Sequence, residues 1–441
     1  MSQNTIQQSE FRKRRNDLMS FNADGATIIA ANHNFQRNND VNYEFRQQSD
    51  FWYFTGFEEP DSIIVMLPNN EQSYVMFATP FDETYAIWNG PMTGLDGIRN
   101  DYEVDIAYPI NELATKLPEL LKRYNKLYFS LGNDKNLDEL ISNLVANRRV
   151  NAVRDGNYIT NITDAKPTID KMRLVKSQSE IHMLKTAIET THIGFNRAIN
   201  VTQPGKYEYE IQAALENEFR TAGSIRNGYP SIVASGNNSC ILHYTKNDCK
   251  LTSGDLLLID AGAELDYYTA DITRTWPING KFSVPQKEIY SLVLNAQLNA
   301  ISKIKPNETI DLVNQTAINV LTEGLIDLGL LKGNITDLIE QKAYRQYYMH
   351  GTSHWLGLDV HDSGVYSQNK TFTKLKPGMV LTVEPGLYFS KYNDNVPEEL
   401  KGIGIRIEDN ILVTGNGHAN LSKEIPKEID SIESLVGAVT K

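Results

Sequence analysis

Long apolar runs are missing from this 441-residue sequence. Apolar segments such as IIVML and LLLI have the length of buried strands and fall well short of a membrane span. The N-terminal segment lacks the apolar stretch of a secretory signal. Cysteine is scarce, with Cys240 and Cys249 alone, so we expect two buried or inert thiols and no disulfide framework. These absences predict a cytoplasmic protein that does not act at a membrane.

An excess of positive charge is also missing. The chain has 43 Lys and Arg against 55 Asp and Glu, a formal net charge of −12. Nucleic-acid-binding proteins normally carry a basic stripe, and anionic membranes attract basic segments, so we expect neither partner. The apolar content of 41% and the charged content of 22% are those of an ordinary globular protein.

The length of the chain predicts two domains, because 441 residues exceed what one core usually holds. The first third alternates short β-rich runs, at 26–30, 62–68, 73–79 and 126–131, with a helical pattern at 137–149. This pattern indicates an α/β domain. Ser177 and Glu180 have the spacing of a capping box that opens a helix. We therefore divide the chain into domains 1–173 and 174–441.

In the second domain Asp260 ends the apolar run LLLI, and Asp271 opens the strand-like segment ITRT. A hairpin with its turn near Leu265–Asp266 would place the two aspartates directly opposite each other, with Cβ atoms about 5 Å apart. Two carboxylates that close repel each other unless a cation lies between them. An ordinary pair of strand-end or turn aspartates would give the same pattern.

Two glutamates also occupy strand positions that could face a site. In GIGIRIEDN the isoleucines alternate with Arg406 and Glu408, so this polar pair shares one face, which could be solvated or could line a metal cleft. Glu384 ends the apolar run VLTV and precedes a Pro-Gly turn signal. Such a glutamate lies either beside a pocket or on the surface before a tight turn.

Four of the eight histidines fall in two short segments, as His243, His350, His354 and His361. His350 and His354 have the spacing of a helical zinc motif, but the glutamate of H-E-x-x-H is absent and Gly351 disfavours a helix, so we reject that motif. Asp260, Asp271, His354, Glu384 and Glu408 together form an oxygen-rich ligand set. Such a set suits two hard or borderline divalent cations that ionise a shared water.

The segments that carry these residues resemble the pita-bread metallopeptidases, and most closely their bacterial Xaa-Pro aminopeptidase (aminopeptidase P) branch. The likeness lies in ILHYTKND (241–248), LLLIDAGAE (256–264), DITRTWPINGKF (271–282), MHGTSHWLGLDVHD (349–362), MVLTVEPGLY (379–388) and GIGIRIEDN (402–410). It extends into the first domain through SDFWYFTGFEEPDS (49–62) and the Ile87-Trp88 segment. The resemblance implies a creatinase-N-like α/β domain followed by an α+β pita-bread catalytic domain.

The resemblance also implies a cofactor and an activity. The cofactor is two divalent ions, most often manganese: Asp260 and Asp271 hold one ion, Asp271 bridges to the second, His354 and Glu384 complete it, and Glu408 bridges both. The activity is hydrolysis of the bond between any N-terminal residue and a following proline, by a hydroxide that bridges the metals. Glu384 is our candidate general base.

Further roles follow from the same resemblance. His243, His361 and Arg406 support catalysis, the histidines through the substrate and the tetrahedral intermediate and Arg406 through a ligand carboxylate. His350, Tyr388 and Trp88 contact substrate, with Trp88 reaching a neighbouring subunit's site in a dimer or tetramer. Peptides with proline at the second position are the expected partners.

Two other functions stay open at this stage. A prolidase, which cleaves Xaa-Pro dipeptides, would carry the same ligand set. A non-catalytic pita-bread binding module would keep the fold, although such modules typically lose ligands, and all five are present here.

Overall fold

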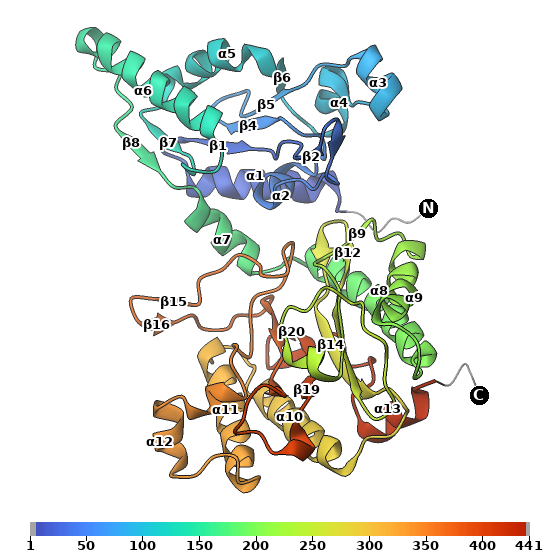
Figure 1. The fold of residues 1–441 in the computed structure, drawn as a ribbon. Coiled ribbons are helices and arrows are strands. Elements are labelled where there is room, and N and C mark those ends of the chain that lie inside the picture. The colour runs from blue at the N-terminus through green and yellow to red at the C-terminus, as the bar shows by residue number, and fades with distance from the viewer. Residues whose placement is uncertain (1–5, 438–441) are drawn as a thin grey trace. The chain divides into compact units, whose positions relative to one another are not determined.

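The computed structural model describes residues 6–437, which separate into two compact units (Figure 1). The first unit ends at Met172 and the second begins at Arg173. Both cysteines are free thiols, as expected; Cys240 is half-buried and Cys249 is exposed. No helix among residues 6–437 is both long and apolar enough to cross a membrane.

The first unit is built on a mixed sheet with the strand order β6-β5-β4-β1-β7-β8. Strand β4 runs antiparallel to its neighbours β1 and β5, and the other neighbouring strands are parallel. Helices α5 and α6 cover one face of the sheet, and α1 and α2 lie on the other (Figure 1). The strands are β1 (Ala26–Ala30), β2 (Gln36–Asn38), β3 (Val41–Asn42), β4 (Ile63–Met66), β5 (Tyr74–Ala78), β6 (Ile106–Pro109), β7 (Lys126–Tyr128) and β8 (Asn161–Thr163).

The helices of the first unit include the one predicted at 137–149, which forms the centre of α6. They are α1 (Gln8–Phe21), α2 (Ser49–Thr55), α3 (Glu83–Asn89), α4 (Gly94–Asp101), α5 (Leu113–Leu120), α6 (Lys135–Asp155) and α7 (Lys166–Leu174), the last of which runs two residues past the boundary into the second unit. The four predicted strand runs appear as β1, β4, β5 and β7, so the prediction of an α/β unit is confirmed.

The second unit combines long helices with short antiparallel strands. Its first helix begins with the predicted capping box, in which the Ser177 hydroxyl accepts from the Glu180 N–H and the Glu180 carboxylate accepts from the Ser177 N–H. The helices are α8 (Gln178–Val201), α9 (Glu208–Thr221), α10 (Val284–Ser302), α11 (Ile310–Asp327), α12 (Ile335–Glu340) and α13 (Ile429–Leu435). The strands before α10 are β9 (Arg226–Asn227), β10 (Ile232–Ser235), β11 (Leu256–Ala261), β12 (Ala263–Leu265), β13 (Tyr268–Thr269) and β14 (Ile272–Pro277).

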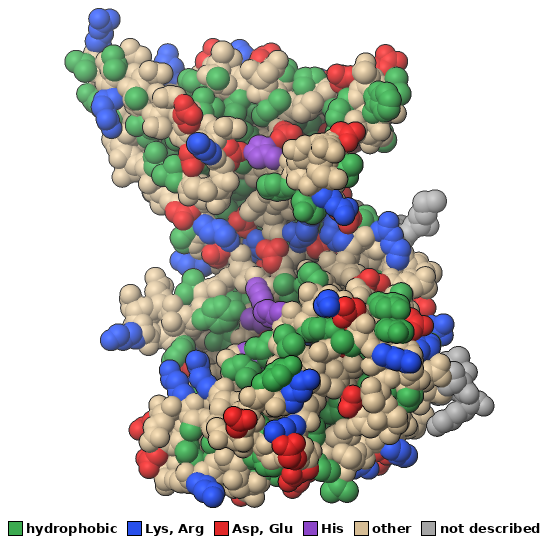
Figure 2. Space-filling model, viewed as in Figure 1, with side chains coloured by type: hydrophobic (Ala, Val, Ile, Leu, Met, Phe, Trp, Pro, Cys, Tyr) green, Lys and Arg blue, Asp and Glu red, His purple; other side chains and the backbone are tan. Residues whose placement is uncertain are grey.

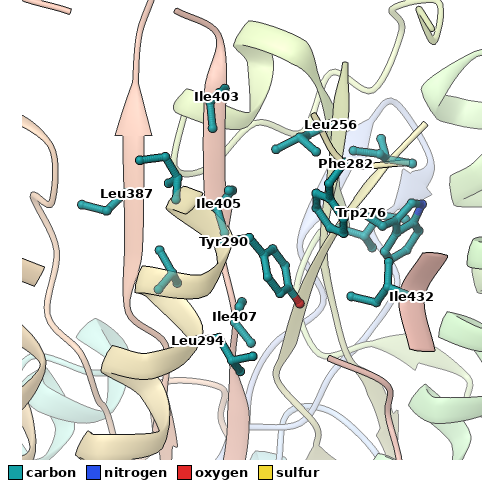
Figure 3. Close-up of a cluster of buried hydrophobic side chains, with 14 of the residues drawn as sticks. Leu256, Trp276, Phe282, Tyr290, Leu294, Leu387, Ile403, Ile405, Ile407 and Ile432 are labelled. Atoms are coloured by element: carbon teal, nitrogen blue, oxygen red, sulfur yellow. The ribbon is translucent and has the colours of Figure 1, made fainter. Parts of the chain in front are cut away.

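The remaining strands of the second unit follow α12. They are β15 (Ser367–Gln368), β16 (Thr371–Phe372), β17 (Val380–Val383), β18 (Gly386–Phe389), β19 (Ile403–Arg406), β20 (Asp409–Val413) and β21 (His418–Asn420). Tyr290 and Leu294 of α10 pack beside Ile405 and Ile407 in the large apolar core of this unit (Figure 3). The isoleucines of GIGIRIEDN thus point into the core, as their alternation predicts, and direct Arg406 to the opposite face.

The first hairpin of the second unit has a different register from the predicted one. Its turn is at Asp266–Tyr267, both with positive φ (43° and 68°), one residue beyond the predicted position. Asp260 therefore pairs with Thr273, and Asp271 is its diagonal neighbour on the same face, so the prediction of directly opposed aspartates was wrong. Moving a two-residue turn by one position shifts the register by two, which keeps both carboxylates on one face.

A second ladder of the same unit is interrupted where Glu384 lies. Val383 pairs with Asp409 and Gly386 with Arg406 in one continuous register, which leaves Glu384 and Pro385 opposite residues 407 and 408. The strand continues past Pro385 without reversing, so the predicted Pro-Gly turn was wrong. Proline lacks the N–H that a ladder needs and opens a gap in the pairing. The two glutamates therefore face each other across this gap.

Candidate metal centre

A cavity of about 620 Å³ in the second unit collects most of the predicted site residues. Histidine side chains gather at one place on the face of this unit shown in Figure 2. The predicted residues that line the cavity are Asp260, Asp271, Glu384, Glu408, Arg406, His243, His350, His354 and His361.

Two predicted site residues do not line this cavity. Tyr388, on β18, is buried, and its hydroxyl contacts both His350 and Arg406, which do line it. Trp88 belongs to α3 of the first unit and is 83% exposed. Its role at a neighbouring subunit's site stays a prediction.

Asp271, His354 and Glu408 form the centre of the cluster, with one ligand atom from each lying within 4.8 Å of the others. The His354 Nδ1 atom lies 3.0 Å from the backbone oxygen of Trp355, which fixes its proton on that nitrogen. The Nε2 atom is thereby directed at Asp271 Oδ2 (3.2 Å) and Glu384 Oε1 (3.3 Å). Burial alone lowers the pKa of His354, but Asp271 and Glu384 outweigh it and raise the pKa to about 9.

Glu408, the most buried of the four carboxylates, has one oxygen engaged and one not. The Thr273 hydroxyl donates to Glu408 Oε2 at 2.6 Å, whereas Oε1 is buried and has no hydrogen-bond partner among residues 6–437. Burial, followed by the charges of Asp271 and Glu384, raises the pKa of Glu408 well above its ordinary value. A buried carboxylate oxygen without a donor is costly and is stabilised by a cation.

The pKa values of Glu384 and Asp260 shift in the same direction. Burial raises the pKa of Glu384 to about 7, although the charge of His354 opposes the shift. Burial and the charge of Asp271 raise the pKa of Asp260, although Arg406 opposes them. The side chain of Glu384 is 17% exposed, more than those of Asp260 (12%) and Asp271 (7%), so it is the one of these three that meets the cavity most openly.

A directional chain of hydrogen bonds joins one edge of this cluster to His350. The Arg406 guanidinium, which can only donate, contacts Asp260 Oδ2 at 2.5 Å and the Tyr388 hydroxyl at 3.0 Å. Tyr388 therefore donates its own proton to His350 Nε2 at 2.7 Å, and His350 Nδ1 donates to the Gly351 carbonyl at 2.8 Å. Burial, then the Arg406 charge, lowers the pKa of His350 to about 3. The imidazole is therefore neutral, so its Nε2 atom can accept the proton of Tyr388.

Sequence reasoning missed Tyr229. Its hydroxyl lies 2.7 Å from Asp260 Oδ1 and 2.6 Å from Asp271 Oδ1, so it bridges the diagonal pair. Burial and the two aspartate charges raise its pKa well above the ordinary value, so the hydroxyl keeps its proton and donates. Tyr229 precedes a proline in an irregular segment, where no local pattern indicates a role. Thr273 was also missed, although its spacing of two from Asp271 places both on one strand face.

His361 and His243 occupy loops at the rim of the cavity. The His361 ring packs edge-on against His354, with centroids 4.5 Å apart, and burial followed by the His354 charge lowers its pKa. His243 is exposed on the segment between η3 (Gly236–Cys240) and β11. Leu242 and Val360, each next to one of these histidines, add apolar surface to the cavity wall.

The arrangement fits divalent cations. Four carboxylates and the Nε2 atom of His354 converge there, and among residues 6–437 Arg406 is the one Lys or Arg that forms an ion pair with any of these carboxylates. Oxygen-rich donor sets with one imidazole suit hard or borderline divalent ions. The raised pKa values and the unpartnered Glu408 oxygen both indicate a position where positive charge is required.

Comparison with known protein families gives matches over both units. The model of metallopeptidase family M24 matches residues 182–415, and that of the aminopeptidase P N-terminal domain matches residues 11–128. The chain is 44% identical over 433 residues to Xaa-Pro aminopeptidase of Haemophilus influenzae, covering 98% of each chain.

Solved structures are similar over nearly the whole chain. An aminopeptidase of Pseudomonas aeruginosa superimposes with a TM-score of 0.96 at 39% identity, covering 99% of each chain. Zinc-substituted Escherichia coli aminopeptidase P in complex with product has a TM-score of 0.94 at 40% identity, covering 99% of this chain and 100% of that one. The fold is therefore that of an aminopeptidase P N-terminal domain followed by a pita-bread catalytic domain, as the resemblance implied.

Proposed function

Because the chain belongs to metallopeptidase family M24, we propose that it is an Xaa-Pro aminopeptidase, which removes the N-terminal residue of peptides that have proline in second place. The observation that carries this proposal is the convergence of four carboxylates, His354 and the rim histidines His243 and His361 in one cavity. The full-length similarity to Xaa-Pro aminopeptidases supports it.

A family M24 enzyme uses divalent metal, and the carboxylates and His354 of this cavity fit such ions. We propose that Asp260, Asp271, His354, Glu384 and Glu408 hold two of them, with manganese as the resident metal. When bound, such ions lower the pKa of water and polarise a peptide carbonyl. Arg406 orients Asp260 through its 2.5 Å contact, and its charge opposes the rise in the Asp260 pKa that burial causes.

Glu384 is the proposed general base, because its carboxylate is the one most open to the cavity. It accepts the proton of the attacking water. The Thr382 hydroxyl donates to its Oε1 at 3.4 Å, and the neutral His350 ring lies beside it, with Nδ1 3.6 Å from Oε2. The Thr382 hydroxyl is the donor that orients this carboxylate.

Proline at the second position sets two requirements for the rim of the cavity. The nitrogen of an Xaa–Pro bond carries no N–H, so the site cannot recognise that bond through a donor and must supply a proton when the nitrogen leaves. Leu242 and Val360 offer apolar surface to the ring, and we propose that His243 and His361, beside them, orient the substrate and stabilise the tetrahedral intermediate. His350, Tyr388 and Trp88 are the proposed substrate contacts.

The test is hydrolysis of Xaa-Pro-Xaa peptides by the purified protein with added manganese, cobalt or zinc. We expect release of the first residue, loss of activity with a chelator and recovery with manganese. A prolidase would cleave Xaa-Pro dipeptides in preference to longer peptides. The similarity to Xaa-Pro aminopeptidases does not favour this alternative. A binding module would take up metal without cleaving either substrate. Activity that persists without metal would contradict the mechanism.

Two further proposals concern the setting of the enzyme. We propose that it is a cytoplasmic homo-oligomer, a dimer or tetramer, without nucleic-acid or membrane partners. Trp88 provides the test of assembly: its 83% exposed side chain should become protected in the oligomer, and Trp88→Ala should lower activity only under conditions in which the oligomer forms.

A further inference from the structure

Glu208 is a fully buried carboxylate that the proposed mechanism does not use. It is the first residue of α9, where free backbone N–H groups and the helix dipole favour a negative charge. Its oxygens accept five hydrogen bonds, all from neutral donors. They come at Oε1 from the Ser235 N–H (2.7 Å), the Ser235 hydroxyl (2.7 Å) and the Asn238 amide (3.1 Å), and at Oε2 from the Tyr244 hydroxyl (2.8 Å) and the Cys249 N–H (2.9 Å).

These donors lie at both ends and in the middle of one loop, which we define as residues 235–249. Ser235 ends β10 and Cys249 precedes the return of the chain to β11, so one carboxylate closes the loop at its base. Between them the chain forms η3 and then runs without regular hydrogen bonding from 241 to 249. Side-chain hydrogen bonds take the place of a ladder in this loop.

The side chains of the loop divide between the protein interior and the cavity. Tyr244 and Asn247 are buried, whereas Leu242, His243 and Thr245 line the cavity. Asn247 adds a second anchor, since its side chain accepts from the Val233 N–H at 3.0 Å and donates to the Ser231 carbonyl at 2.8 Å. The position of His243 therefore depends on the backbone of the loop, which these inward side chains hold.

A metal site is the competing interpretation of the same group. Ligand atoms of Glu208, Asp248 and Cys249 lie within 4.8 Å of one another. Both oxygens of Glu208 are already engaged, however, and the donors to Oε2 include a backbone N–H that cannot move away without opening the loop. The geometry is that of a structural anchor.

We infer that Glu208 is a positioning residue that holds the loop 235–249 in place and thereby sets the position of His243 at the cavity rim. This inference rests on the proposed function for its kinetic consequence, and on the hydrogen bonds alone for its structural one. Glu208→Gln keeps the size of the side chain but turns an NH2 group toward two or three donors, which leaves buried groups unsatisfied.

The experiment compares Glu208→Gln with Glu218→Gln in the metal-loaded full-length protein. Glu218 lies on the same helix, so the second change alters the net charge equally without touching the loop. We expect Glu208→Gln to lower kcat/KM for an Xaa-Pro-Xaa peptide about tenfold with metal content unchanged, and Glu218→Gln to leave it within twofold. In a His243→Ala background, Glu208→Gln should lower kcat/KM by less than about twofold, because the group it positions is gone.

An equal loss in both backgrounds would overturn the role of Glu208 in positioning His243. Hydrogen exchange, which needs no activity, separates this outcome from failure of the proposed function. Glu208→Gln should speed exchange within 235–249 and leave β17 and β20 unchanged, and unchanged exchange in the loop would overturn the inference even in an inactive protein. If Glu208→Gln does not fold, Tyr244→Phe removes one donor, keeps the ring and should show the same pattern with a smaller effect.

Discussion

Glu408 and Asp409 are adjacent buried carboxylates that point to opposite faces of one chain segment and meet opposite surroundings. Glu408 faces the cavity, where burial and other carboxylates raise its pKa well above the ordinary value. Asp409 faces Arg274 at 2.7 Å and Lys427 at 2.5 Å, and although burial opposes them, these charges hold its pKa well below the ordinary range. On the face of Asp409 the protein's own Arg274 and Lys427 provide the positive charge. On the face of Glu408 the positive charge must come from a bound ion.

The same contrast separates the metal centre from a second buried ion-pair cluster. Asp362, next to His361, contacts Lys176 at 2.8 Å and Arg173 at 2.5 Å, with all three side chains at most 3% exposed. These two ion pairs fix the loop that carries His361, and no external ion is needed. Buried carboxylates with lowered pKa values thus mark structure in this unit, and those with raised pKa values mark the site.

The largest expected effect comes from the cavity face. Glu384→Gln removes the proposed proton acceptor and one buried charge from a repelling cluster. We expect kcat to fall by about 10²–10⁴-fold while the melting temperature of the metal-free protein is unchanged or higher. Steady-state kinetics and thermal unfolding of one preparation check this. Full turnover would remove Glu384 as the base.

The second prediction makes matched changes at the two neighbours. Asp409→Asn leaves Arg274 and Lys427 buried without their carboxylate, and we expect it to cost about 3–5 kcal/mol of stability. Glu408→Gln should reduce the stability of the metal-free protein only slightly, yet it should weaken metal binding and abolish activity. Urea unfolding in chelator, with metal titration of each variant, measures both effects. Equal destabilisation by the two changes would contradict the contrast.

The sequence alone predicts that Glu408 and Asp409 point to opposite faces of their strand, but it does not predict which charges surround each of them. Period two in GIGIRIEDN places Glu408 and Asp409 on opposite faces, and the resemblance singled out Glu408. Arg274 lies 135 residues from Asp409, so which face carries cations depends on how the two ladders pack together. The diagonal position of Asp260 and Asp271 was missed because it depends on a one-residue placement of the turn at Asp266–Tyr267.

The third prediction concerns the metal-free protein as pH rises. Glu384 has a pKa of about 7 in the folded chain against an ordinary 4.5, so the folded state holds the proton more tightly. Its contribution to stability is therefore fully present below pH 4.5 and is lost as pH rises through 7, by about 3 kcal/mol. Urea unfolding in chelator between pH 4.5 and 7.5 should show this fall, and Glu384→Gln should flatten it. Added metal should reverse the trend, because it binds the deprotonated carboxylates.

The fourth and smallest effect has the opposite sign, because the carboxylate involved is compensated. Burial alone would raise the pKa of Asp362, but Lys176 and Arg173 outweigh it and lower the pKa from the ordinary 3.8 to about 2. The unfolded chain therefore binds the proton first as pH falls. The contribution of Asp362 is fully present above about pH 4 and is lost as pH falls through 2, by at most about 2 kcal/mol.

Asp362→Asn isolates this contribution from that of other acidic groups. The variant is destabilised at neutral pH, since it leaves two buried cations without a partner, but it should lose less stability than the wild type between pH 4 and pH 2.5. Urea unfolding in chelator over this range measures the two slopes, which should differ by up to one proton, about 1.4 kcal/mol per pH unit. Parallel slopes would show that Lys176 and Arg173 do not lower the Asp362 pKa, and the contrast between compensated and uncompensated carboxylates would then fail at this cluster.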